Sequence, residues 1–128
     1  MRLLLDTHAL IWWFLDAPNL SAAARKAITA AQEPVYVSAV SAYEISNKVR
    51  LGKLPQAAAL DGAFEDFLVA QQFEPLPITV GHAREAGALA IAHRDPFDRL
   101  LIAQALAEGL VLVSNEAVFD GFGVRRLW

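Results

Sequence analysis

The chain contains no cysteine and carries no excess of basic residues. Among its 128 residues, 11 lysines and arginines stand against 14 aspartates and glutamates, which gives a formal net charge of −3. The absence of cysteine excludes disulfides and thiolate metal ligands and fits a reducing compartment, so we expect a cytoplasmic protein. The acidic balance argues against a generally basic surface, so any nucleic acid must be held by local basic groups.

Long apolar runs are also missing. A membrane-spanning helix needs about 20 consecutive apolar residues, and the longest candidate run, residues 9–15, is far shorter. Asp6 interrupts the N-terminal apolar run too early for a secretory signal, and we expect no membrane partner. The composition is nonetheless apolar, with 55% hydrophobic residues and a mean hydropathy of +0.34. We therefore expect one domain, residues 1–128, with a large core and some apolar surface left for a partner.

Hydrophobic periodicity and punctuation predict strands that alternate with helices. The predicted strands cover residues 2–5, 35–38, 111–114 and 124–127. The predicted helices cover residues 7–15, 21–31, 41–51, 79–92 and 96–109, and another begins at Asp61 and ends before Pro75. Asp95 is expected to cap the last helix, with Pro96 in its first turn. This alternation predicts an α/β fold of three layers, with a central, mainly parallel sheet of four to five strands flanked by helices.

Four acidic residues lie where predicted strands give way to the following segments. They are Asp6, Glu44, Asp98 and Glu116. In an open parallel sheet, ligands bind outside the carboxyl ends of the strands, so acids far apart in sequence can converge on one pocket there. Carboxylates at such short distances repel one another, and a hard divalent cation such as Mg²⁺ or Mn²⁺ neutralises their charge. Metal-dependent phosphodiester chemistry is therefore the leading hypothesis.

Each acid also has a purely structural explanation. Glu44 fits a capping box with Ser41, in which a glutamate reaches back to the amide of the cap residue. Asp98 fits the first turn of a helix, where a carboxylate interacts favourably with the helix dipole. Glu116 fits a solvated loop residue. Asp6 has the weakest structural explanation, because a carboxylate that ends a buried strand needs a cation or several donors to stay ionised.

The other polar candidates are also open to two interpretations. Thr7 and Ser114 can orient ligating carboxylates, or they can serve as an N-cap and a strand-end hydroxyl. The histidines lack the spacing of a zinc site. Basic residues that flank Glu44 and Asp98 are candidate phosphate contacts, or else solvated or ion-paired side chains. These basic residues are Lys48, Arg50, Lys53, Arg94 and Arg99.

Four segments of the chain carry a family resemblance. They are residues 4–12 (LLDTHALIW), 37–54 (VSAVSAYEISNKVRLGKL), 93–105 (HRDPFDRLLIAQA) and 113–119 (VSNEAVF). In this order they resemble the PIN-domain ribonucleases of the VapC toxin type. The resemblance implies a PIN-like fold and an Mg²⁺-dependent endoribonuclease, dimeric and neutralised by a small antitoxin. It also implies an apolar groove for that antitoxin, to which we expect Trp12, Trp13 and residues 40–73 to contribute.

Carried over by position, the acids of the family fall on Asp6, Glu44 and Asp98, and Glu116 stands where the family commonly has an aspartate. We expect Asp6 and Asp98 to bind Mg²⁺, or Mn²⁺ as a substitute, directly. Glu44 is expected to ligate the ion or its water, and Glu116 to contribute at most through water. A single-stranded or looped RNA is the expected substrate, because splayed strands can enter an acidic cleft that a duplex cannot.

Two other classes of protein are alternatives. A response-regulator receiver also binds Mg²⁺ at strand ends, but it has a pair of acids near the first strand and a lysine at the end of a late strand. In this chain the first strand is followed by a single acid, Asp6, and the late strand ends at Ser114 and Asn115 without a lysine. A PIN-like module that binds RNA or protein without catalysis is the other alternative, and the presence of the acids argues against it.

Overall fold

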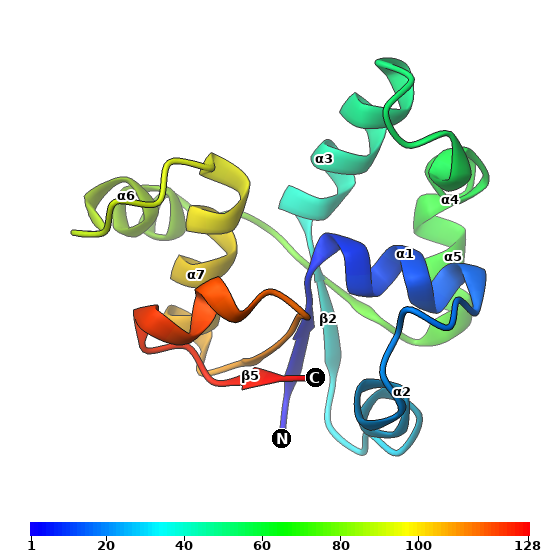
Figure 1. Ribbon diagram of the computed structural model, residues 1–128, viewed down its shortest axis with the longest axis horizontal. Coiled ribbons are helices and arrows are strands. Elements are labelled where there is room, and N and C mark those ends of the chain that lie inside the picture. Colours follow the sequence, from blue (N-terminus) through cyan, green and yellow to red (C-terminus); the bar gives the residue numbers. More distant parts are fainter.

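The computed structural model describes residues 1–128 as an α/β fold built on one parallel sheet. Its strands are β1 (Leu3–Leu5), β2 (Val35–Ser38), β3 (Glu74–Leu76), β4 (Val111–Val113) and β5 (Arg126–Leu127). All strand pairs are parallel, and the order across the sheet is β3-β2-β1-β4-β5 (Figure 1). The predicted fold class is confirmed. Strand β3 was not predicted, because its Pro75 argues against a strand, but it lies at an edge, where proline is tolerated.

Seven helices and two 3₁₀ turns surround the sheet. They are α1 (Thr7–Leu15), α2 (Ala22–Thr29), α3 (Ala39–Arg50), η1 (Pro55–Ala57), α4 (Ala58–Gly62), α5 (Phe64–Gln71), α6 (Val80–Ala88), α7 (Pro96–Glu108) and η2 (Ala117–Phe122). The helix predicted from Asp61 is wrong in its start, since α4 and α5 are separate helices that meet at Ala63. The helix predicted through residue 92 ends at Ala88. Asp95 caps α7 and Pro96 opens it, as predicted.

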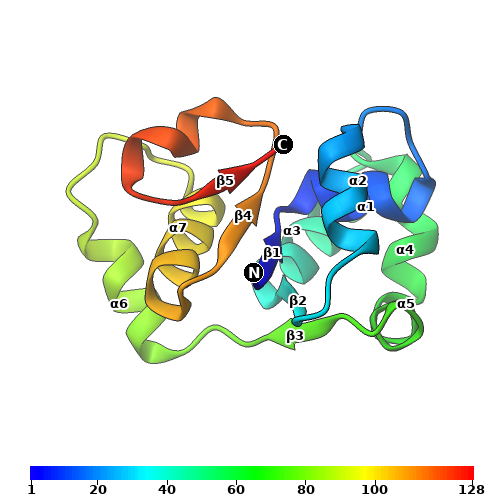
Figure 2. The same cartoon turned by 90° about the horizontal axis from the view of Figure 1, so that it is seen from below.

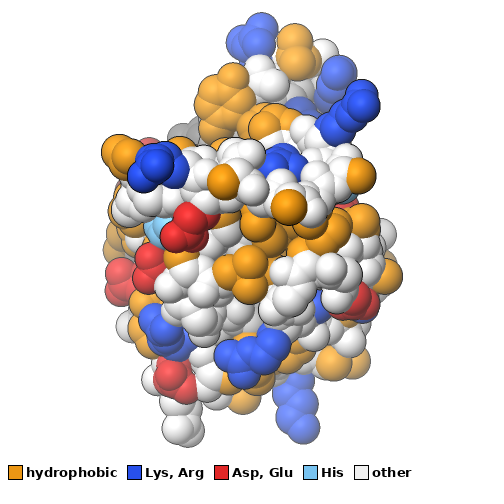
Figure 3. Space-filling model, turned by 90° about the vertical axis from the view of Figure 1, so that its left-hand side faces the viewer, with side chains coloured by type: hydrophobic (Ala, Val, Ile, Leu, Met, Phe, Trp, Pro, Cys, Tyr) orange, Lys and Arg blue, Asp and Glu red, His pale blue; other side chains and the backbone are white.

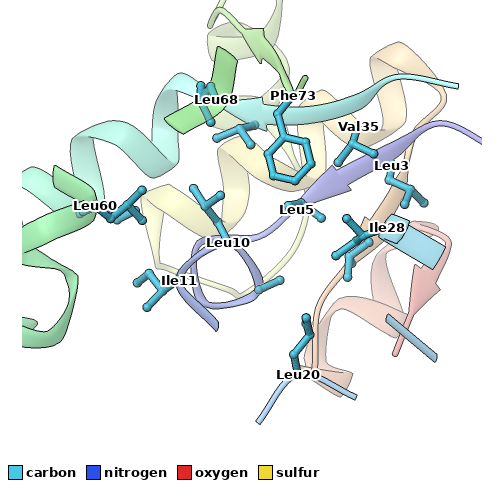
Figure 4. Packing of buried hydrophobic residues seen from close by; sticks show 14 of the residues in the cluster. Leu3, Leu5, Leu10, Ile11, Leu20, Ile28, Val35, Leu60, Leu68 and Phe73 are labelled. Carbon is cyan, nitrogen blue, oxygen red and sulfur yellow. The ribbon is translucent and has the colours of Figure 1, made fainter. Parts of the chain in front are cut away.

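Helices cover both faces of the sheet. Successive side chains of a strand point to opposite faces, so Leu3 and Leu5 enter one apolar cluster and Leu4 enters another. The first cluster includes residues of α1, α2 and α5, and Figure 4 shows Leu10 of α1 and Phe73 packed around Leu5. The second is built largely by α7 and β4. Figure 2 shows α1, α2, α4 and α5 on one side and α6 with α7 on the other, which gives the predicted three layers.

The strand order determines where a ligand site is expected. From β1 the chain adds β2 and β3 on one side, and it then crosses to add β4 and β5 on the other. The crevice outside the carboxyl ends of β1 and β4 is therefore a topological switch point, where open α/β sheets bind ligands. In a receiver domain β1 lies between β2 and β3, whereas here it lies between β2 and β4. The receiver alternative is therefore excluded. None of the helices is both long and apolar enough to cross a bilayer.

Candidate active site

A small acidic pocket lies at the switch point of the sheet. Its volume is about 90 Å³, and it is lined by Asp6, Thr7, His8, Glu44, Lys48, Asp95, Asp98, Leu101 and Glu116. The four acids singled out in the sequence thus line a single pocket, although each belongs to a different part of the chain. Helix α3 packs against both α1 and α7. Figure 1 shows α1 and α3 beginning above β1 and β2.

Asp6 connects the end of β1 to the start of α1. It is the N-cap of α1, and its Oδ1 accepts a hydrogen bond from the amide of Ala9 at 2.8 Å. Its side chain is buried, and this burial raises the pKa of the carboxyl to about 6, although hydrogen bonds from Ser114 and Ala9 lower it. The negative charge of Glu116 raises the same pKa further. Asp6 therefore has a capping role that the sequence did not suggest, and a carboxyl whose charge is poorly solvated.

Glu44 lies in the second turn of α3 and is buried. Ser38 is the cap of this helix, and its hydroxyl accepts from the amide of Val40 at 3.0 Å, so the capping-box explanation for Glu44 is wrong. Thr7 donates to Oε1 of Glu44 at 2.7 Å, and Lys48 donates to Oε2 at 2.5 Å. Both carboxylate oxygens thus have donors. The predicted orienting role of Thr7 has a direct geometric basis, whereas its alternative as an N-cap does not, since Asp6 is the cap.

Asp98 and Glu116 are both partly buried and close enough to influence each other. Nε2 of His93 lies 2.7 Å from Oδ2 of Asp98. Burial raises the pKa of Asp98, and the charges of Asp95 and Glu44 raise it further. Burial also raises the pKa of Glu116, with the charge of Asp98 as the next cause. Glu116 is therefore electrostatically coupled to the other acids and is not simply a solvated loop residue.

Three residues around the pocket were missed or undervalued in the sequence. Asp95 lines the pocket in addition to capping α7, where it accepts from the amide of Phe97 at 2.9 Å. His8 also lines the pocket, and its position two residues after Asp6 was the available signal. His93 lies on the segment that connects α6 to α7, and its Nε2 contacts Asp98. Its place five residues before Asp98, across a helix cap, gave no sign of this contact.

The basic residues predicted to contact phosphate differ in their surroundings. Lys48 pairs with Glu44, and Arg50 donates to Asn47 at 2.8 Å on an exposed turn of α3. Arg94 is exposed, as is Lys53. For Arg99 the prediction needs correction, because its guanidinium donors are engaged by main-chain carbonyls. On the face seen in Figure 3, basic, acidic and apolar side chains are interspersed and no broad basic patch forms.

The pocket offers the right kind of donor for a hard cation. Its acids supply carboxylate oxygens, which Mg²⁺ and Mn²⁺ prefer. No three His, Asp or Glu side chains converge tightly enough to hold an ion in their present positions. In these positions Lys48 occupies Oε2 of Glu44, whereas His93 contacts only Oδ2 of Asp98. The donor set thus fits such a cation, provided that Glu44 exchanges Lys48 for it.

Comparisons with known proteins show the family of the chain. The family model described as "PIN domain" matches residues 3–124. Ribonuclease VapC22 of Mycobacterium tuberculosis is 33% identical over 118 residues, which cover 88% of this chain and 85% of that protein. Among solved structures, FitAcB from Neisseria gonorrhoeae has a TM-score of 0.72 at 21% identity, with 98% of this chain and 96% of that chain covered. VapBC-1 from nontypeable Haemophilus influenzae has a TM-score of 0.68 at 14% identity, with the same coverage of 98% and 96%. The chain therefore belongs to the PIN-domain family and, within it, is a relative of the VapC ribonucleases.

Proposed function

We propose that this PIN-domain protein is an Mg²⁺-dependent endoribonuclease of the VapC toxin type, which hydrolyses phosphodiester bonds in RNA. The observation that carries the proposal is the convergence of Asp6, Glu44, Asp98 and Glu116 on one small pocket at the switch point of the sheet. The similarity to Ribonuclease VapC22 supports RNA as the substrate. Mn²⁺ is expected to substitute for Mg²⁺, because both are bound by oxygen ligands.

Each acidic side chain of the pocket has its own proposed role. Asp6 and Asp98 are proposed to hold the cation directly, and Glu44 to hold it or a water molecule beside it. A divalent cation there supplies Lewis acidity, lowers the pKa of water and neutralises charge that develops on the phosphoryl oxygens. Thr7 keeps Glu44 aimed into the pocket through its hydrogen bond. Glu116 is proposed to contribute through water, and Ser114 to hold Asp6 in place.

The substrate is proposed to be a single-stranded or looped RNA. The pocket is small and acidic, so a phosphodiester reaches it more readily from a flexible strand than from a duplex. The proposed phosphate contacts are Lys48, Arg50 and Arg94. Lys48 lines the pocket, and the two arginines are exposed and lie within six residues of Glu44 or Asp98 in the sequence. Arg99 is not among them, because main-chain carbonyls engage its donors. No protein nucleophile is needed, because water attacks the phosphorus.

We also propose that the protein is a homodimer and is inhibited by an antitoxin. Several of the solved structures that it resembles are toxin–antitoxin complexes, among them one from Klebsiella pneumoniae with a TM-score of 0.67 and VapBC2 from Rickettsia felis with a TM-score of 0.65. An apolar groove of about 480 Å³ is available for an apolar helix of a partner. Its apolar lining comes from β2, α3, α5 and the segment around β3, and includes Val37, Ala42, Phe64, Leu68 and Leu76.

The tryptophans of α1 do not form this groove, contrary to expectation. Trp13 and Phe14 are half-buried and pack on Phe73 and Phe67, with ring centroids 6.2 Å and 5.0 Å apart. Trp12 packs against Trp128 in a tilted arrangement, with ring centroids 5.7 Å apart. These contacts place the α1 aromatics against the first apolar cluster. The apolar surface proposed for a partner is therefore the groove that residues between Val37 and Pro77 line, and not that of α1.

One observation favours a second candidate function, a module that binds RNA or protein without catalysis. Two of the acids are already paired with basic side chains, and no three acids converge as a ready metal site. If the pair of Lys48 with Glu44 persists in solution, the pocket lacks a ligand that the cation needs. The two candidates therefore differ in one property, the binding of a divalent ion by the acids.

Cleavage of a labelled single-stranded RNA separates the two candidates. The wild type is expected to cleave with Mg²⁺ or Mn²⁺ and to be inactive in EDTA. Asp6→Asn and Asp98→Asn are expected to lose roughly a hundredfold or more of this activity, because each removes a proposed ligand. Asp66→Asn, an exposed acid on α5, is the matched control and should cleave like the wild type. Near wild-type turnover in either pocket variant at saturating Mg²⁺ would contradict the proposal, and a wild type that binds RNA without cleaving it would favour the binding module.

A further inference from the structure

The side chain of Arg99 is used entirely within the protein. A guanidinium carries five N–H donors in a rigid planar fork, and each of the five in Arg99 has a main-chain carbonyl as its acceptor. The acceptors are the oxygens of Ala86 for Nε (3.0 Å), Ile91 and His93 for Nη1 (3.2 and 2.9 Å), and Gly87 and Leu89 for Nη2 (3.3 and 2.8 Å).

These carbonyls belong to the last turn of α6 and to residues 89–95, which connect α6 to α7. The last carbonyls of a helix have no amide partner inside it, and a cation near them is favourable. Outside the helices and strands, the only backbone–backbone hydrogen bond that reaches residues 89–95 joins the amide of Arg99 to the oxygen of Asp95 at 3.0 Å. Only Leu89 and Ile91 pack partly against the second apolar cluster. Arg99 is therefore the principal polar link between this segment and α7.

The same segment carries a side chain that contacts the acidic pocket. His93 is held at two points, its carbonyl by Nη1 of Arg99 at 2.9 Å and its imidazole by Oδ2 of Asp98 at 2.7 Å. Arg99 and Asp98 are neighbours on α7, so the three residues form a closed ring of contacts. If the guanidinium released residues 89–95, the backbone of His93 would move and the contact with Asp98 would be lost.

We propose that Arg99 is a positioning residue, which holds residues 89–95 in place so that His93 fixes the carboxylate of Asp98 in the pocket. The inference rests on the proposed ribonuclease function. A phosphate contact by Arg99 would instead require it to give up charge-assisted hydrogen bonds that are individually strong. Lysine keeps the charge but has only three donors on one nitrogen, so it cannot bond carbonyls spread over this segment.

The test is the variant Arg99→Lys. Arg84→Lys is the matched control, because Arg84 is exposed on α6 and its guanidinium has no hydrogen-bond partner. In Arg99→Lys, kcat for a single-stranded RNA should fall at least tenfold, which corresponds to about 1.4 kcal/mol, while KM changes little. The NMR order parameters of the backbone amides of residues 89–95 should fall in Arg99→Lys and not in Arg84→Lys, without a global loss of stability. A raised KM with unchanged kcat would mean that Arg99 binds RNA phosphate, and this outcome would overturn the proposal.

A double-mutant cycle tests whether Arg99 acts through His93. In the background of His93→Ala, the further change Arg99→Lys should cost much less than it does in the wild type, because the contact that it supports is already gone. Equal costs in the two backgrounds would contradict the proposal. NMR spectra of the two variants Arg99→Lys and Asp98→Asn should show the imidazole signal of His93 at the same chemical shift.

A measurement on the unmutated protein covers the case in which Arg99→Lys does not fold. The Nε–H signal of Arg99 should be protected from solvent exchange in the free protein and should not shift when single-stranded RNA is added. A strong shift on RNA addition would overturn the proposal. If the wild type proves unable to cleave RNA, the proposed function fails, whereas the exchange and NMR measurements still report whether Arg99 holds residues 89–95 and His93.

Discussion

The hydroxyl of Thr7 donates to Oε1 of Glu44 at 2.7 Å and so joins the first residue of α1 to the second turn of α3. The same oxygen of Thr7 lies 3.0 Å from the hydroxyl of Ser41. All three side chains are buried, so little water is available to replace this hydrogen bond. The relationship explains how a residue without a charge can control the direction of an acid on another helix.

Thr7→Val should therefore reduce both stability and activity. The substitution keeps the shape of the side chain but leaves a buried carboxylate oxygen without its donor, at a cost of about 1–3 kcal/mol in the free energy of unfolding. Cleavage of RNA should fall about tenfold, as is typical when a group that orients a metal ligand is lost. Thr29→Val, at an exposed position of α2, is the control for both urea unfolding and cleavage. Unchanged activity in Thr7→Val would show that Glu44 needs no such support.

The raised pKa of Asp6 predicts a pH-dependent gain in stability for Asp6→Asn. In the folded protein burial raises this pKa from 3.8 to about 6, so between these values the folded state holds a proton that the unfolded chain has released. The contribution of this group to the free energy of unfolding therefore falls as the pH rises through this window and stays low above it. In EDTA, Asp6→Asn should gain at most about 3 kcal/mol over the wild type above the window and nothing below it.

Urea denaturation at a series of pH values measures this difference. The variant keeps an oxygen that can cap α1, but an amide accepts from Ala9 more weakly than a carboxylate does, which reduces the gain. Asp66→Asn should show no comparable pH dependence, because Asp66 is exposed. A wild type that is more stable than Asp6→Asn at every pH would mean that the carboxylate acts mainly as a structural cap.

Divalent cations should raise the melting temperature of the wild type. A ligand that binds only the folded state stabilises it by about 2.7 kcal/mol at 100 times its dissociation constant. Mg²⁺, Mn²⁺ and Ca²⁺ should all stabilise, but Ca²⁺ should not support cleavage, because it accepts looser geometry at longer distances. Calorimetry that detects no effect of any of these ions would count against a metal site.

Removal of the competing ammonium group should strengthen cation binding. Lys48 donates to Glu44 at 2.5 Å and therefore occupies an oxygen that the cation needs. Lys48→Met should raise the affinity for Mn²⁺ several-fold in titration calorimetry and should weaken RNA binding at the same time, because a proposed phosphate contact is lost. Lys53→Met, at an exposed position, should change the affinity for Mn²⁺ and the binding of RNA less than Lys48→Met does. Weaker Mn²⁺ binding by Lys48→Met would contradict the view that the two cations compete.

The elements that carry the acids could be predicted because local signals determine them. The apolar run of β1 ends abruptly at Asp6, and the pair Asp95 and Pro96 is a strong start signal for a helix, as α7 shows. The acids then converge because the strands are parallel, which follows from their alternation with helices. Strand β3 escaped prediction because Pro75 opposes strand formation, and only its pairing with β2 reveals it.

The interactions inside the site could not be predicted for a different reason. The contacts of Glu44 with Thr7 and of Arg99 with the end of α6 depend on how separate helices pack together. The pairing of Lys48 with Glu44 spans four residues and is visible as a possible helix contact, but the sequence gives no sign that it lies in a pocket. Charge and spacing thus identified the groups, and tertiary packing determined their partners.

Anomalous diffraction from crystals soaked in Mn²⁺ tests most directly whether the acids form a cation site. We predict a peak in the pocket within coordination distance of Asp6 and Asp98, with Lys48 moved away from Glu44 and His93 still in contact with Asp98. The peak should be absent from crystals of Asp6→Asn prepared in the same way. A wild-type crystal with no peak in the pocket at saturating Mn²⁺, or with one only elsewhere on the surface, would contradict the assignment of this pocket as a metal-dependent active site.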